Sequence, residues 1–220
     1  MVPGEGGHGI ALDGRLLRTP ARADLRLPRG LAEAMAVEWR SQGERLKPAA
    51  MPLTQLAYTA IDRVAPDPAP VIEELMGYAG TDLVCYRAES PPALVERQRR
   101  HWQPLLDDLA RRHGALLTAH AGIVPRSQPE PALAALRRHV LSLRPFALTG
   151  LAAAARTCGS LVIALALADK RLTAEEAFEL SQLDESYQIE QWGEDAEAAA
   201  RRRSLRQEIA DIERFLSLAC

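Results

Sequence analysis

The sequence predicts an α+β fold in which a small N-terminal β element precedes a predominantly helical body. Alanine and leucine dominate the apolar residues and aromatic residues are only 5% of the chain, a bias that favours helices. Within residues 9–28, by contrast, short apolar runs flank Asp13 and Gly14. This dipeptide tolerates positive φ at both positions and closes tight β-hairpins. We therefore expect a small β region over residues 1–29 and a helical domain over residues 30–220.

Helical periodicity extends over the rest of the chain, where apolar residues recur at spacings of three and four. The helices that this period predicts cover residues 30–43, 53–64, 71–79, 94–114, 132–143, 146–169, 173–191 and 195–217. Pro104 is expected to kink or interrupt the fourth of these helices, because proline lacks a backbone donor. The short apolar segment 83–86 fits either a helix or a strand. The pattern of residues 116–131 predicts an extended segment followed by a proline-rich loop.

The charge balance excludes two classes of partner. The formal net charge of the 220-residue chain is −2, so no overall basic excess is available for nucleic acid or anionic lipid. The longest apolar run, residues 161–168, is far shorter than the roughly 20 residues that a membrane-spanning helix needs. The first residues show neither the basic stretch nor the apolar core of a signal peptide. We therefore expect a cytoplasmic protein that neither binds nucleic acid nor inserts into a membrane.

The cysteines and glycines indicate no catalytic site. Cys85, Cys158 and Cys220 are far apart, which predicts neither a disulfide framework nor a zinc cluster and fits a reducing compartment. Cys158 lies among apolar residues of a predicted helix, where a thiol is inert. The glycine-rich residues 4–9 precede a strand, whereas a nucleotide-binding fingerprint would follow one. We predict no enzyme activity and no cofactor.

A block of negative charge lies between Leu172 and Ala200, a stretch without lysine or arginine. Its nine acidic residues are Glu175, Glu176, Glu179, Asp184, Glu185, Glu190, Glu194, Asp195 and Glu197. Such a block is either a pair of solvated helix faces or a docking surface for a basic patch on a protein partner. It excludes a helix-turn-helix, because a recognition helix beside phosphates cannot lack cations. Four arginines within residues 201–206 are expected to balance these acidic turns.

Metal chemistry is an alternative use of the same carboxylates. Glu190 and Glu194 are spaced to hold a divalent cation or to act as an acid and base pair, as in a metal-dependent hydrolase. Helical metal sites usually recruit histidine as well. The five histidines all lie outside the acidic block, which argues against a metal.

The segment from Trp192 to Asp195 separates two predicted helices. Gly193 stops the first helix, and the two carboxylates that follow are placed to accept hydrogen bonds at the start of the next. An indole beside carboxylates is also typical of protein interfaces. From this chemistry we choose as partner contacts Trp192, Glu194, Asp195 and Glu197, followed by Asp184 and Glu185. A generic helical protein-binding adaptor would use them in the same way.

Five groups of motifs follow one another along the chain. In the first part they are Leu12-Asp13-Gly14-Arg15 with Arg18-Thr19-Pro20, Glu38-Trp39 with Gln42-Gly43-Glu44, and Met51-Pro52-Leu53-Thr54 with Thr59-Ala60-Ile61-Asp62. Later come Gly80-Thr81-Asp82-Leu83 with Cys85-Tyr86-Arg87-Ala88, and then Gln191-Trp192-Gly193-Glu194-Asp195. Together they resemble the assembly chaperones that guard the alpha subunit of F-type ATP synthase, and the resemblance spans nearly the whole chain.

The resemblance implies a small N-terminal β domain, a helical C-terminal domain and reversible binding to the free alpha subunit, which would prevent its aggregation until the beta subunit displaces the chaperone. It implies no nucleotide and no metal, and we expect a monomer when the protein is free. Bacterial members are expected in the cytoplasm and eukaryotic relatives in the mitochondrial matrix. Members usually carry an aromatic-rich strand before the hairpin. Residues 1–7 lack one, so we expect a truncated β domain here.

Overall fold

A computed structural model describes residues 2–4, 6–122, 124 and 126–219. The helices are α1 (Arg29–Arg40), α2 (Pro52–Thr59), α3 (Ala69–Gly80), α4 (Pro92–His113), α5 (Glu130–Leu141), α6 (Pro145–Cys158), α7 (Leu161–Ala168), α8 (Ala174–Ser181), α9 (Leu183–Trp192) and α10 (Ala196–Ala219). The strands are β1 (Val2–Gly4), β2 (Gly7–Gly9), β3 (Ala11–Leu12), β4 (Arg15–Leu16), β5 (Tyr86–Arg87) and β6 (His120–Ala121). This order confirms the α+β, mostly helical class.

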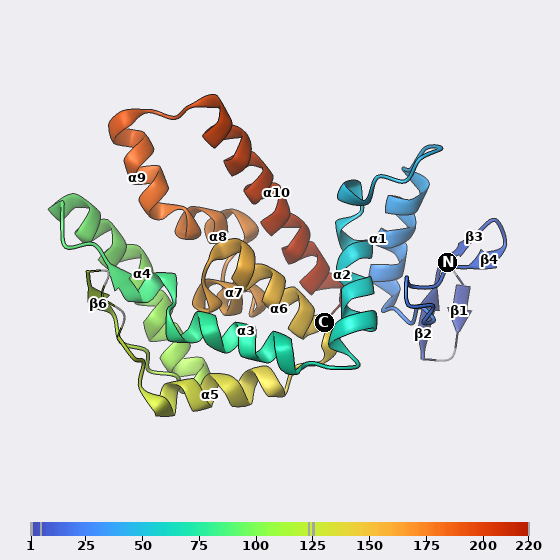
Figure 1. The fold of residues 1–220 in the computed structure, drawn as a ribbon, viewed down its shortest axis with the longest axis horizontal. Coiled ribbons are helices and arrows are strands. Elements are labelled where there is room, and N and C mark those ends of the chain that lie inside the picture. Colours follow the sequence, from blue (N-terminus) through green and yellow to red (C-terminus); the bar gives the residue numbers. More distant parts are fainter. Residues whose placement is uncertain (1, 5, 123, 125, 220) are drawn as a thin grey trace.

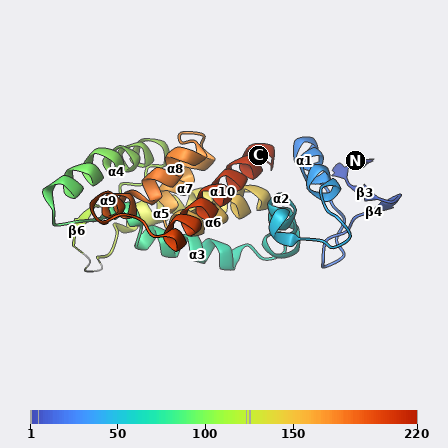
Figure 2. The same cartoon turned by 90° about the horizontal axis from the view of Figure 1, so that it is seen from above.

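The molecule is elongated, with the β region and α1 at one end and α4 and α9 at the other (Figures 1 and 2). Helix α10 runs between these regions (Figure 1). In its last turns, Phe215 belongs to a small core with the β region, α1 and α2, whereas Leu216 belongs to the large core of the helical body. Helix α10 therefore ties the two cores together.

The hairpin at Asp13 and Gly14 is confirmed. Strands β3 and β4 pair antiparallel around it, and the two turn residues have φ of 49° and 77°. The β region is larger than the single hairpin that we expected, because β1 and β2 form a second antiparallel pair ahead of it, although without an aromatic residue. Met1 and Glu5 lie outside the described residues.

The β region is anchored by burial. Ile10, Leu25 and Leu27 are at most 5% exposed and pack against Leu31 and Met35 of α1. This supplies the packing that a marginal two-stranded hairpin requires. The β region shares this small core with α1 and α2 and therefore does not have a core of its own. The division of the chain into residues 1–29 and 30–220 stays a prediction.

Two predicted helices are each broken into two. The helix predicted over residues 146–169 is α6 and α7, because Gly159 adopts the left-handed conformation (φ 67°) that ends α6. The hydroxyl of Ser160 then accepts a hydrogen bond from the backbone N–H of Ile163 and caps α7. Asp82 fixes this junction, since its buried carboxylate accepts from the Ser160 hydroxyl (2.6 Å) and from the backbone N–H of Val162 (3.0 Å).

The helix predicted over residues 173–191 is α8 and α9, which meet at Gln182. In the last turn of α8, the carbonyl of Leu180 accepts from the indole N–H of Trp102 (3.0 Å) rather than from a continuing helix. The carbonyl of Phe178 accepts from the backbone N–H of Gln182 (3.0 Å), which closes α8, and also from the hydroxyl of Ser181. The break therefore depends partly on a residue of α4.

Helix α4 runs through Pro104 without interruption, so the predicted early break was wrong, while the alternative of a kink stays a prediction. The helix ends as predicted at Gly114, whose φ is 65°. Residues 83–86 form a 3₁₀ turn followed by β5, which pairs in parallel with β6. Ile123 and Pro125, in the predicted loop, lie outside the described residues. None of the helices within the described residues combines the length and the hydrophobicity that a membrane span requires.

Candidate functional site

The chosen partner contacts lie on α9, on the three-residue segment after it and on the first turn of α10. These elements form an arch at the end of the molecule opposite the β region (Figure 1). Helix α9 is weakly buried, since Leu183 is its one buried residue among those described. The arch is therefore held in place mainly by polar contacts.

Trp192 is the last residue of α9, and its side chain is 79% exposed. Gly193 follows with a φ of 86°, which ends the helix. Tryptophan is usually well buried in folded proteins, so an indole this exposed is informative. It matches the large aromatic anchors that carry much of the binding energy in protein interfaces.

The two carboxylates after Gly193 are engaged by α10. Asp195 accepts hydrogen bonds from the backbone N–H groups of Glu197 and Ala198, at 2.9 Å each, and so caps the helix. Glu194 forms an ion pair with Arg202 (3.2 Å), which lies in the second turn of α10. Capping and pairing thus account for both residues locally, while Glu197 is exposed in the first turn.

Asp184 is held by α4. Its carboxylate accepts a hydrogen bond from the side-chain amide of Gln98 (2.8 Å), a residue that is only 1% exposed. The side-chain oxygen of Gln98 accepts a second hydrogen bond, from the backbone N–H of Ala88 (2.7 Å). Asp184 therefore positions α9 on α4 rather than facing solvent freely, whereas Glu185 next to it is half-exposed and forms no ion pair with a described residue.

Arginines neutralise part of the acidic block. Glu190 receives two hydrogen bonds of 2.7 Å from Arg97, which lower the pKa of its carboxyl group. Glu175 pairs with Arg206 (3.1 Å). The expectation that the arginines after the block balance it is thus confirmed for Arg202 and Arg206. Because Glu190 and Glu194 each face an arginine, they do not form the metal-binding pair considered above.

Sequence reasoning missed a groove between α4 on one side and α8 and α9 on the other, which we call the leucine groove. Its apolar lining includes the side chains of Leu105, Leu172, Leu180 and Leu183. Arg100 lies at its α4 rim and Glu179 at its α8 rim. The helical periods of the separate segments predicted apolar faces but could not show that these faces would border one groove.

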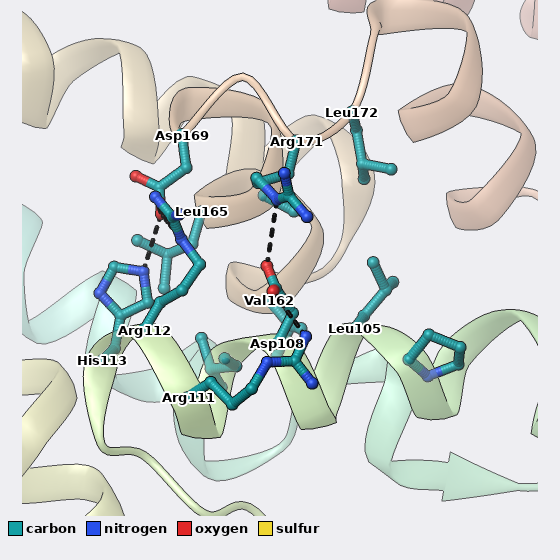
Figure 3. A pocket seen from close by; sticks show the side chains of 13 residues that line it. Leu105, Asp108, Arg111, Arg112, His113, Val162, Leu165, Asp169, Arg171 and Leu172 are labelled. Carbon is teal, nitrogen blue, oxygen red and sulfur yellow. Dashed lines mark hydrogen bonds and ion pairs between the residues drawn. The ribbon is translucent and has the colours of Figure 1, made fainter.

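A second pocket, of about 220 Å³, lies between α4 and α7 (Figure 3). Its charges are paired with one another: Asp108 with Arg111 and Arg171, and Asp169 with Arg112 and His113. A histidine beside an aspartate suggests a base and its orienting carboxylate. The described residues that line the pocket include no serine, threonine, cysteine or lysine that such a base could activate. The pairs of Asp169 with Arg112 and His113, and of Asp108 with Arg171, instead hold the end of α4 against the segment that follows α7.

Thiol and metal chemistry find no support in the described residues. Burial raises the pKa of Cys85 and that of Cys158 to about 12, so both thiols stay protonated and unreactive at neutral pH. Within the same residues, no group of three or more histidine, cysteine, aspartate or glutamate side chains could hold a metal ion. Cys220 lies outside the described residues.

Comparisons with known proteins indicate one family. Residues 2–110 match the family described as ATP12 chaperone protein. The Schizosaccharomyces pombe protein named "Protein atp12, mitochondrial" is 27% identical over 197 residues, which are 84% of this chain and 68% of that protein. The crystal structure of Atp12 from Paracoccus denitrificans is 44% identical, with a TM-score of 0.92, and the match covers 98% of this chain and 93% of that one.

An aspartate-to-lysine mutant of the P. denitrificans protein is also similar, at 43% identity and a TM-score of 0.93, over 99% of this chain and 93% of that one. These matches confirm the resemblance that the motifs show to the assembly chaperones of F-type ATP synthase. With this identity over nearly the full length of both chains, the chain belongs to the ATP12 chaperone family.

Proposed function

We propose that this protein binds the unassembled alpha subunit of F-type ATP synthase and keeps it from aggregating until it pairs with the beta subunit. Its membership of a chaperone family and its ordered motifs support this role. The observation that carries the proposal is the exposed indole of Trp192, on an arch that also carries the exposed Glu197. Among its described residues, this arch contributes Leu183 alone to the buried main core.

Masking is the mechanism that we propose. A subunit waiting for its partner exposes apolar interface that would otherwise aggregate. A protein that covers this surface lowers the free energy of the soluble state by about 2.7 kcal/mol when it is present at 100 times its dissociation constant. Such a holder needs no nucleotide cycle, provided that it binds more weakly than the final assembly does.

The six chosen residues have different roles in this proposal. Trp192 and Glu197, which are exposed, and Glu185, which is half-buried, would contact the partner directly, because no ion pair with a described residue engages either carboxylate. Glu194 would contact the partner through the part of its carboxylate that stays accessible to solvent in the ion pair with Arg202. Asp184 and Asp195 would act indirectly, by holding α9 on α4 and by capping α10. Reversing the charge of Asp195 should therefore destabilise the arch as well as weaken binding.

Light scattering tests the proposal directly. Free alpha subunit is diluted from denaturant with and without an equimolar amount of this protein, and co-elution of the two chains is measured by size exclusion. We expect suppressed scattering and a joint peak. Trp192→Ala should lose most of the suppression while keeping the helical circular dichroism and Tm. Leu141→Ala is the matched control, because Leu141 is also an exposed apolar residue (59%) but lies on α5.

Unchanged scattering with a folded protein would overturn the proposal. Equal suppression of an unrelated aggregating protein would instead favour a generic adaptor. We place the protein in the bacterial cytoplasm or the mitochondrial matrix, where the alpha subunit is assembled. The relative named as mitochondrial supports this placement.

A further inference from the structure

The leucine groove has a shape and a charge pattern that the proposed function does not yet use. Leu105 and Leu180 are half-buried and Leu183 is 5% exposed, so apolar surface lies along the groove without being fully covered by the protein. Both walls are helices, with α4 on one side and α8 and α9 on the other. No strand edge borders the groove in the described chain, so an extended peptide could not add to it by backbone pairing.

The rims of the groove carry opposite charge. Arg97, Arg100 and His101 lie three and four residues apart, on one face of α4. Glu179 lies on the opposite rim, on α8. Arg100 and Glu179 are both exposed, and neither forms an ion pair with another described residue. Each is therefore available to a charge of opposite sign on a partner.

A bridge between α4 and α9 forms part of the groove lining. Arg97 and Glu190 join α4 to α9 through two hydrogen bonds of 2.7 Å, and the guanidinium of Arg97 also lies over the ring of Tyr187. From this bridge to Leu105 is eight residues of α4, or about 12 Å at the rise of an α-helix. This length accommodates about two turns of a helix, which would contribute two or three apolar side chains on one face.

We propose that the leucine groove binds a short amphipathic helix of the unassembled alpha subunit. Its apolar face packs on Leu105 and Leu180, an acidic side chain on one flank faces Arg100, and a basic side chain on the other flank faces Glu179. The opposite rim charges fix which way round the helix lies. This inference rests on the proposed function. It gives the alpha subunit a second contact surface besides the arch, and helix α9 belongs to both surfaces.

Binding measurements on variants test the groove separately from the arch. The probe is free alpha subunit, and its affinity is measured for the wild-type protein and for Leu105→Glu, Arg100→Glu and Glu179→Lys. We expect Leu105→Glu to bind at least about tenfold more weakly, the effect of losing one central interface residue. Arg100→Glu and Glu179→Lys reverse rim charges, so each should weaken binding by a smaller factor, mainly through slower association. The matched controls are Leu141→Glu and Arg138→Glu, which make the same changes at exposed positions on α5 and should bind as the wild type does.

Circular dichroism and Tm establish that each variant is folded. Arg100→Glu and Glu179→Lys guard against a folding defect in Leu105→Glu, since both side chains are exposed. If the wild type binds the alpha subunit and the groove variants bind it with the same affinity, the groove proposal is wrong and the proposed function stands. Absence of wild-type binding would overturn both. Equal weakening by the α5 controls would also overturn the groove, because the effect would then follow from charge alone.

Photocrosslinking identifies the occupant. A photoreactive amino acid at position 105 should attach to one segment of the alpha subunit, and mass spectrometry should place that segment in an amphipathic helix. A crosslink to a second copy of this protein, or to an extended segment, would refute the assignment. The same probe at position 141 should give no crosslink.

Discussion

Replacing Gly150 with alanine tests how closely α10 packs on α6. A methyl group at this position would lie 2.5 Å from Cδ2 and 2.8 Å from Cγ of Leu216, and 3.3 Å from Cδ1 of Phe215. Carbon atoms in favourable contact are about 3.5–4.0 Å apart. Leu216 is only 6% exposed, so its side chain has little room to move aside. Either Leu216 leaves its rotamer or the last turns of α10 shift away from α6.

Two opposing effects set the magnitude. Alanine is better than glycine inside a helix by about 1 kcal/mol. Overpacking a core costs about 1–3 kcal/mol, and contacts this short favour the upper part of that range. We therefore expect Gly150→Ala to destabilise the protein by about 1–2 kcal/mol. Leu216→Ala alone should cost about 2–5 kcal/mol, because it leaves a cavity. In the double variant the new methyl group enters that space, which should recover about 1–2 kcal/mol.

Urea unfolding of the four proteins in this double-mutant cycle gives the coupling free energy. Gly77→Ala is the control, because Gly77 lies in α3 and an added methyl group there meets nothing within 4 Å. That variant should be stabilised by up to about 1 kcal/mol. A Gly150→Ala protein as stable as the wild type, or effects that add to within about 0.5 kcal/mol, would refute the packing argument.

Two further predictions concern Asp82 and Gly14. Burial raises the pKa of Asp82 from 3.8 to about 6, so its contribution to stability is fully present below about pH 3.8 and is lost as the pH rises through 6, by up to about 3 kcal/mol. Asp82→Asn lacks this titration. The difference in unfolding free energy between this variant and the wild type should therefore change by about 2 kcal/mol from pH 4 to 7, which is most of the full effect, and parallel pH curves would contradict the assignment. Gly14 has a φ of 77° and open space around it, so Gly14→Val should lower the Tm through backbone strain of about 1–2 kcal/mol. Gly43→Val, at a position with equal space and no positive φ, should not, and equal Tm losses would rule strain out.

Local chemistry explains what could be predicted of the fold. The hairpin at Asp13 and Gly14 requires two residues that accept positive φ, and that requirement is visible in the dipeptide itself. Gly114 likewise predicts the end of α4. The break at Gly159 had a signal in the glycine and the serine that follows it, but the apolar period on either side suggested one long helix. Competing local signals of this kind are settled by tertiary contacts, here by the carboxylate of Asp82.

The candidate site divides in the same way. Its acidic composition, the position of Trp192 next to carboxylates and the motifs of the ATP12 family are visible in residues that are close together along the chain, so the sequence was sufficient to identify the family and the mostly helical class. The exposure of Trp192 came from the structure. Which carboxylates are neutralised depended on Arg97, which lies 93 residues before Glu190. The leucine groove likewise needed α4 beside α8 and α9. Short-range propensities act within a few residues, whereas ion pairs and grooves form between segments that only the folded core brings together, and these were decided by the tertiary structure alone.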